Sequence, residues 1–170
     1  NGGSIMTIYY PNSNSSDGRL IQVVGQRFST QLTSSSSTFV NTGLTLSLTT
    51  KEANSQIILV SQLSLDCAAD GLYARVKFCW TRSLNGGSAN TFMCSGQEGF
   101  GAYLGSHGSG HMRHYGQTAQ IIFDPQSLTG NIAAGTVVNY NCQAKCESHA
   151  NQDFRINYGG QDSSMFIMEV

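Results

Sequence analysis

The chain has 170 residues, a formal net charge of −1 and only 11% charged residues, whereas Ser, Thr, Asn and Gln together supply 59 residues. The length corresponds to one domain, and the near-zero net charge excludes a nucleic-acid-binding surface, because neutralising phosphates needs a surplus of Lys and Arg. No stretch reaches the ~20 apolar residues of a membrane-spanning helix, and the first residues lack the basic and apolar regions of a signal peptide, so neither is expected.

The first 17 residues differ in composition from the rest. Tyr9, Tyr10 and Pro11 are followed by a polar run from Asn12 to Gly18. This pattern predicts an extended N-terminal arm and linker over residues 1–17, ahead of a single domain over residues 18–170. The apolar residues expected to anchor the arm are Ile5, Ile8, Tyr9 and Tyr10.

Alternation of apolar and polar residues dominates the remainder. It is sustained over Leu44–Leu48, Leu72–Trp80 and Val138–Cys146, and a period of two indicates β-strands with one buried and one exposed face. Ile57–Val60 is instead a continuous apolar run, typical of a strand covered on both faces or of a sheet corner. Further strand candidates are Leu20–Gln31, Gln117–Asp124, Asp153–Tyr158 and Ser163–Val170.

Turn-forming residues separate these segments, and only Lys51–Asn54 and Pro125–Leu128 hint at single helical turns. About eight or nine strands with regular turn signals predict an all-β fold, an antiparallel β-sandwich of jelly-roll type.

The segment Gly99–Gly116 combines six glycines with three of the four histidines. So many glycines predict a long loop, and long loops in compact domains often carry function. We therefore expect receptor contacts in this loop and in the turn Leu84–Asn90. The expected contact residues are Tyr103, His107, His111 and Tyr115.

Metal binding and catalysis find little support. His107, His111 and His114 have the spacing H-x3-H-x2-H, but no carboxylate or cysteine accompanies them, so we expect loop histidines and no metal. There is no nucleophile elbow and no phosphate-binding glycine loop, and only Asp66 and Asp70 form a close carboxylate pair. No catalytic residue and no cofactor is therefore expected.

The five cysteines are an odd number and match no zinc spacing. Buried free thiols are the favoured interpretation, and a disulfide is the alternative left open.

Several short stretches follow one another in a characteristic order along residues 19–170. They are Leu20–Val24, Ser34–Ser37, Thr38–Thr49, Asn54–Val60, Met112–Pro125, Thr136–Lys145, Phe154–Gly160 and the terminal Ser163–Val170. Their order and the final Met-Glu-Val resemble the C-terminal domains of bacteriophage and marine-virus virion proteins, especially tail-fibre and capsid-appendage proteins. Thr50-Lys51 stands where that family usually has a proline, and no family site is carried over onto the cysteines or histidines.

The resemblance implies a homotrimeric domain that is displayed on a virion assembled in the host cytoplasm. The leading hypothesis is a non-enzymatic fibre tip that binds a host-surface glycan or protein through apical loops. One alternative is a capsid decoration or knob protein, held to other virion proteins by the arm Gly2–Tyr10. A polysaccharide depolymerase is a second alternative, disfavoured by the shortage of paired carboxylates, and a cellular lectin-like sandwich is a third.

Overall fold

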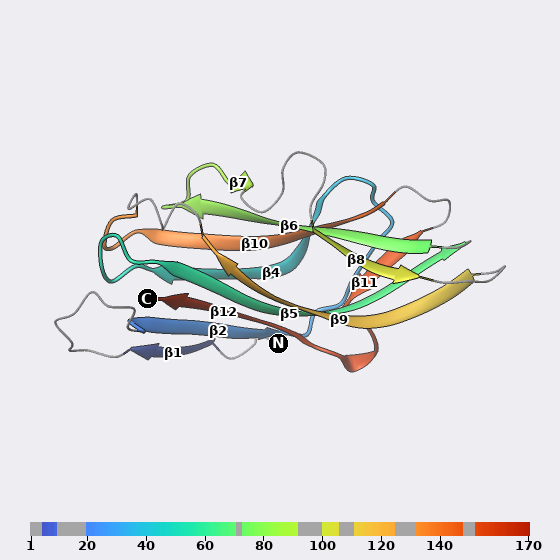
Figure 1. The fold of residues 1–170 in the computed structure, drawn as a ribbon, viewed down its shortest axis with the longest axis horizontal. Coiled ribbons are helices and arrows are strands. Elements are labelled where there is room, and N and C mark those ends of the chain that lie inside the picture. Colours follow the sequence, from blue (N-terminus) through green and yellow to red (C-terminus); the bar gives the residue numbers. More distant parts are fainter. Residues whose placement is uncertain are drawn as a thin grey trace.

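The structure is a computed structural model that describes residues 5–9, 20–70, 73–91, 100–105, 111–124, 132–147 and 152–170. In these residues the chain forms two antiparallel sheets packed face to face (Figure 1). The all-β antiparallel sandwich predicted from the alternation is thereby confirmed.

The larger sheet, sheet A, is organised around one long strand. Its members are β1 (Ile5–Tyr9), β2 (Gln22–Phe28), β12 (Ser163–Glu169), β5 (Ile57–Asp70), β11 (Asp153–Ile156), β3 (Leu32–Ser34) and β9 (His111–Phe123). Strand β5 pairs along one side first with β12 and then with β11, and along its other side with β9. It is therefore the centre of sheet A.

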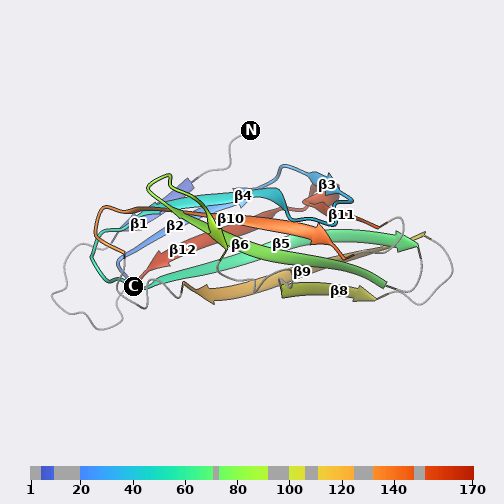
Figure 2. The ribbon, with the colours of Figure 1, turned by 90° about the horizontal axis from the view of Figure 1, so that it is seen from above.

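The smaller sheet, sheet B, lies over sheet A. Its members are β4 (Val40–Thr49), β10 (Val137–Cys146), β6 (Tyr73–Leu84), β7 (Asn90–Thr91) and β8 (Phe100–Gly105). Strand β10 pairs with β4 on one side and with β6 on the other, and β7 and β8 pair with β6. Strands β5, β6, β8 and β9 all extend to the same end of the sandwich (Figure 2).

The alternating segments supply the core between the sheets, as their period of two requires. Leu44, Leu46 and Leu48 of β4 are buried, as are Phe78 and Trp80 of β6. The alternate residues of β10 from Val138 to Cys146 are buried too. Each large apolar side chain removed from water contributes about 1.5–3 kcal/mol, which makes this layer the main source of stability.

The prediction of a long loop over Gly99–Gly116 is wrong for the part of this segment that the structure describes. Residues 100–105 form β8 and residues 111–116 begin β9. Gly101 and Gly105 lie opposite Lys77 and Tyr73 of β6 in the ladder. Strand β6 pairs with β8 and strand β5 pairs with β9, and this tertiary pairing outweighs the low intrinsic strand preference of glycine.

Part of the N-terminal arm belongs to the sandwich. Residues 5–9 form β1, which pairs with β2 at the margin of sheet A. Ile5, Ile8 and Tyr9 lie in this strand, whereas Tyr10 is outside the described residues. An anchoring role for these residues stays a prediction.

A carboxylate near the end of the chain is buried against the turn after β4. Glu169 is fully buried and accepts hydrogen bonds from the amide of Gln22, the backbone N–H groups of Lys51 and Glu52, and the hydroxyl of Ser55. The suggested helical turn at residues 51–54 is instead an irregular turn closed around this carboxylate. The four donors compensate for taking the charge out of water.

A second buried charge joins the two sheets at the end of β9. Asp124 is fully buried, and it pairs with Arg82 of β6 and accepts a hydrogen bond of 2.6 Å from Tyr140 Oη of β10. Burial and the neighbouring Asp124 carboxylate raise the pKa of Tyr140 far above its ordinary value. This cluster fixes β9 against sheet B.

Candidate functional site

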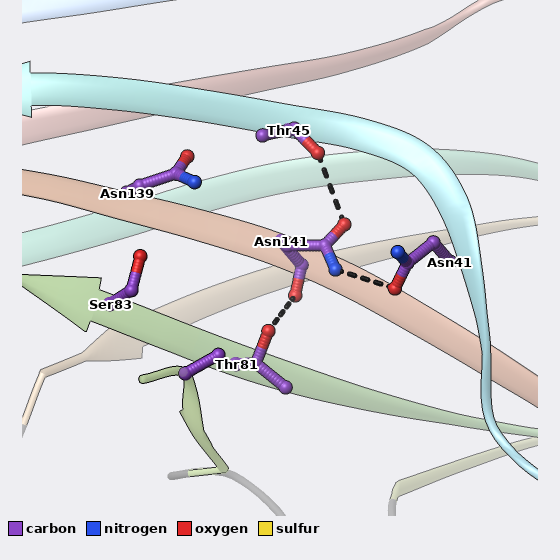
Figure 3. Close-up of a pocket in the computed structure, with 7 residues that line it drawn as sticks. Asn41, Thr45, Thr81, Ser83, Asn139 and Asn141 are labelled. Carbon is purple, nitrogen blue, oxygen red and sulfur yellow. Dashed lines mark hydrogen bonds between the residues drawn. The ribbon is translucent and has the colours of Figure 1, made fainter. Parts of the chain in front are cut away.

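The outer face of sheet B carries a shallow hollow of about 220 Å³. Side chains from β4, β10 and β6 surround it (Figure 3). Its lining residues are Asn41, Thr45, Thr81, Ser83, Ala89, Asn139 and Asn141. Every one of them is uncharged, and all but Ala89 carry a hydroxyl or an amide.

Strand register brings these polar groups together. Asn141 lies between Thr45 of β4 and Thr81 of β6, and Asn139 lies between Ser47 and Ser83. The alternation that buries one side of each strand turns these residues to the opposite side. Two parallel rows of hydroxyl and amide groups therefore cross three strands.

A bulge in β4 places Asn41 at the end of the hollow. The register shifts between Asn141 and Gln143, and Gly43 takes a φ of +83°, which a residue with a Cβ adopts only with strain. The hydroxyl of Thr42 donates to the carbonyl of Cys142 at 2.9 Å and holds the bulge against β10. Such bulges redirect side chains along a strand.

Hydrogen bonds fix the orientation of the side chains. Thr45 Oγ1 donates to Asn141 Oδ1 at 3.1 Å, and Asn141 Nδ2 donates to Asn41 Oδ1 at 2.8 Å (Figure 3). Gln143 Nε2 also donates to Asn41 Oδ1, at 2.9 Å. Thr81 Oγ1 donates weakly to the carbonyl of Asn141, at 3.4 Å.

Other polar groups remain open to a ligand. In Figure 3 the Asn139 amide and the Ser83 hydroxyl face the hollow and make no hydrogen bond with the other residues drawn. Ser47 Oγ donates to Asn139 Oδ1 at 3.1 Å, which leaves the amide nitrogen of Asn139 as a donor. The hollow can thus exchange hydrogen bonds with a neutral polar molecule, but its own side chains include no group suited to acid–base catalysis.

The size of the hollow limits what it holds. Pockets for drug-sized molecules measure about 300–1,000 Å³, so 220 Å³ suits one small ring or a short part of a longer chain.

The residues predicted to contact a receptor lie elsewhere. Tyr103 is in β8 of sheet B, whereas His111 and Tyr115 are in β9 of sheet A. They lie opposite Arg75, Asp70 and Asp66 in their ladders. His107 lies outside the described residues. The strands of these residues reach one end of the sandwich (Figure 2), and their receptor role stays a prediction.

The predicted turn after β6 is present and borders the hollow. Asn85 adopts a left-handed φ of 49°, and the N–H of Gly87 donates to the carbonyl of Leu84 at 2.9 Å. The turn leads to Ala89, which lines the hollow. The turn that was predicted to contact a receptor therefore lies beside the observed hollow.

The described cysteines have no role in the hollow. Cys67, Cys79, Cys142 and Cys146 are buried thiols that form no disulfide, as expected from their sequence context. Burial raises the pKa of Cys67 and of Cys146 to about 12, with smaller contributions from nearby carboxylates. Such thiols are unreactive at neutral pH.

Two further findings concern the described residues as a set. They contain no group of three or more His, Cys, Asp or Glu side chains placed to hold a metal ion. They also contain no helix with the length and apolar character needed to cross a membrane.

No protein-family model matches the chain, and no curated protein matches it. What this chain binds must therefore be inferred from its own residues and their geometry.

Proposed function

We propose that this chain is a non-enzymatic binding domain of a virion appendage, present in several copies, which binds a neutral saccharide of the host surface in the hollow of sheet B. The observation that carries the binding role is the pair of uncharged hydroxyl and amide rows that cross β4, β10 and β6. The virion location and the three-copy assembly follow from the sequence resemblance alone.

The saccharide class follows from the chemistry of the lining. Vicinal sugar hydroxyls both donate and accept hydrogen bonds, and so do Asn and Ser side chains. An anionic ligand would find no cation among the lining residues, and a largely apolar ligand would leave the amide of Asn139 and the hydroxyl of Ser83 without partners. A neutral polyol satisfies both groups.

A single copy binds weakly on this account. The hollow is shallow, and no aromatic ring lines it for a sugar to stack on. Linking several copies raises the effective concentration, so that avidity exceeds the affinity of one site by about 10²–10⁴. This matches an appendage that presents several identical domains together.

Saturation-transfer NMR with a panel of neutral methyl glycosides tests the proposal. We expect transfer to at least one methyl glycoside with the wild-type chain, and at least a tenfold weaker response with Asn139→Ala. Thr45→Val changes a residue inside the hollow. Its control is Thr49→Val, which changes an exposed threonine on the same face of β4, four residues further along the strand. Only the Thr45 variant should lose signal.

Other outcomes contradict the proposal in distinct ways. No transfer to any neutral glycoside overturns the saccharide assignment. Loss of signal with Tyr103→Ala but not with Asn139→Ala moves the site to the β8–β9 end. Hydrolysis of a methyl glycoside during the measurement contradicts the non-enzymatic role.

A further inference from the structure

The outer face of sheet A has the opposite character to that of sheet B. Two apolar rows cross β12, β5 and β9 in register. They consist of Phe166, Val60 and Ile121 in one row and Met168, Ile58 and Phe123 in the other. We call these six side chains the apolar face.

Three members of the apolar face are strongly exposed in the single chain. Ile121 is 70% exposed, Phe123 is 54% exposed and Phe166 is 36% exposed, while the other three are half-buried. Isolated exposed apolar residues are common on protein surfaces, but contiguous patches of them mark interaction sites. Six neighbours in two rows form such a patch.

Local packing flattens the apolar face. The ring of Phe166 lies over Gly25 of β2, where a Cβ atom would come within 2.4 Å of Phe166 Cδ1. Gly25 is also the register partner of Phe166. The missing side chain lets the ring lie close to the sheet, and a flat surface suits packing against a second sheet.

The sequence itself shows that β5 is apolar on both sides. Ile57 and Leu59 point into the core and are fully buried, whereas Ile58 and Val60 point outward and are only half-buried. A continuous apolar run is typical of a strand with both faces covered. Among the residues that the structure describes, a second sheet covers only the inner face of β5.

From these observations we propose that the apolar face packs against the apolar face of a second copy of this chain. The inference rests on the proposed function only in that several copies act together. A face that packs against itself joins two copies, so this contact pairs copies and does not by itself build the three-copy assembly that the resemblance implies. Two sheets would then stack about 10 Å apart, as sheets do within a sandwich.

The charge distribution favours a second copy as the occupant. A symmetric contact brings a surface against itself, so a charged surface would repel its own copy. None of the six side chains is charged, and Arg27 on the neighbouring β2 is paired with Asp162. A lipid surface is a poorer match, because membrane-binding faces are typically ringed by Lys and Arg.

The exposed apolar area and the polar residues beside it also fit a contact between two copies. Taking ~200 Å² for a fully exposed large apolar side chain, the three most exposed residues leave about 300 Å² of apolar surface in contact with water. A standard interface buries about 800 Å² on each partner, with an apolar centre and a polar rim. The next two rows supply residues of such a rim, since Gln62 Nε2 donates to Gln117 Oε1 at 2.8 Å on the exposed side.

Sedimentation velocity from 1 to 100 µM tests the inference, against a monomer mass of 18.3 kDa. We expect the wild-type chain to sediment above the monomer mass, and Ile121→Lys to weaken association at least about 30-fold, the effect of losing an interface hot spot. Val137→Lys is the matched control, because Val137 is 40% exposed but lies on sheet B. It should leave the mass unchanged.

The remaining outcomes are decisive as well. A folded wild-type chain that stays monomeric at 100 µM overturns the inference, as does equal dissociation by Val137→Lys. Ile121→Ser, with no added charge, should also dissociate the copies, and circular dichroism confirms that each variant is folded. Binding of a monomeric wild-type chain to phosphatidylcholine vesicles would assign the apolar face to a lipid surface instead.

This test is separate from that of the proposed function. A monomeric Ile121→Lys chain should keep its saturation-transfer signal, because the hollow lies on sheet B. A wild-type chain that oligomerises but gives no saturation-transfer signal with any glycoside would refute only the saccharide proposal. A wild-type chain that gives a signal but stays monomeric would refute only the self-association.

Discussion

The buried carboxylate of Glu169 offers a direct test of how the end of the chain stabilises the sandwich. Oε1 accepts from the N–H of Lys51 at 2.9 Å, from the N–H of Glu52 at 3.0 Å and from Ser55 Oγ at 2.7 Å. Oε2 accepts from the N–H of Lys51 at 3.0 Å and from the amide of Gln22. Both oxygens therefore act only as acceptors.

Glu169→Gln keeps the shape of the side chain but replaces one acceptor oxygen with an NH₂ donor. That donor must then face either the N–H of Lys51 and the Gln22 amide or the three donors on the other side. Rotating the Gln22 amide is no remedy, because its nitrogen also donates to the carbonyl of Thr49 at 2.7 Å.

The loss of stability expected from Glu169→Gln follows from these contacts. Hydrogen bonds to a charged group contribute about 1.5–3 kcal/mol, and a buried donor left unpaired costs about 1–3 kcal/mol. Allowing for partial relaxation, we expect Glu169→Gln to lower the free energy of unfolding by about 3 kcal/mol. With a urea dependence of about 2 kcal/mol/M for a chain of this size, the unfolding midpoint should fall by ~1.5 M.

Equilibrium unfolding in urea, followed by the fluorescence of Trp80, measures this change. Trp80 is the single tryptophan and is fully buried, so its emission reports global unfolding. All variants are compared at one protein concentration, because self-association would itself add stability. Glu52→Gln is the matched control, since its exposed carboxylate should matter by less than ~0.5 kcal/mol. An equally small effect of Glu169→Gln would refute the reasoning.

Further perturbations test the interior and the outer face. Tyr140→Phe removes the hydroxyl that donates to Asp124, and should lower the free energy of unfolding by about 1.5–3 kcal/mol. Asp124→Asn removes the charge that pairs with the buried Arg82, and should cost about 3–5 kcal/mol in the same urea assay; a smaller effect than that of Tyr140→Phe would contradict this account. Gly25→Ala should displace the aromatic ring above it at a cost of about 1–3 kcal/mol, and a neutral result in thermal unfolding would show that the ring is not confined. Cys67 and Cys146 should resist iodoacetamide at pH 8 in the native chain and react in urea, as mass spectrometry of their peptides would show. Their folded pKa of about 12 lies above the unfolded value of 9.0, so the unfolded chain loses these protons first and stability should fall as the pH rises from about 9 to 12; rising stability over that range would oppose the assignment.

Much of the fold was predictable because strand alternation is a local signal. Leu44, Leu46 and Leu48 alternate with polar residues over a few positions, and burial of one side follows directly from the pleat. The same alternation predicted the burial of Cys142. Local alternation is sufficient for such segments because each strand has one buried face.

The glycine-rich strands were not predictable in this way. Gly101 and Gly105 favour a loop when considered alone, and only pairing with the distant β6 makes them part of a ladder. The hollow was missed for a related reason. Thr45 and Asn141 are separated by 96 residues in the chain, and their contact depends on strand register, while the bulge at Gly43 brings Asn41 to the hollow.

The terminal Met-Glu-Val has a structural role that the sequence alone does not show. Met168, Glu169 and Val170 contribute to the family resemblance, but the sequence assigns them no role. In the structure Glu169 closes the turn after β4, while the N–H of Val170 donates to the carbonyl of Gln56 at 2.9 Å. These contacts bind the terminal strand to both the turn and β5.

The opposite chemistry of the two outer faces has a consequence for how an assembly would act. If copies join through the apolar face of sheet A, the hollow of sheet B on every copy points away from the contact. The reason is that the outer faces of the two sheets are on opposite sides of each sandwich (Figure 1). Binding would then occur along the sides of the assembly and would gain strength from several weak sites acting at once. Ile121→Lys separates these contributions. It should leave the glycoside response of each copy intact while reducing retention on a surface densely coated with the same sugar by at least tenfold. Equal retention of the monomeric variant and the wild-type chain would show that joining the copies adds nothing to binding.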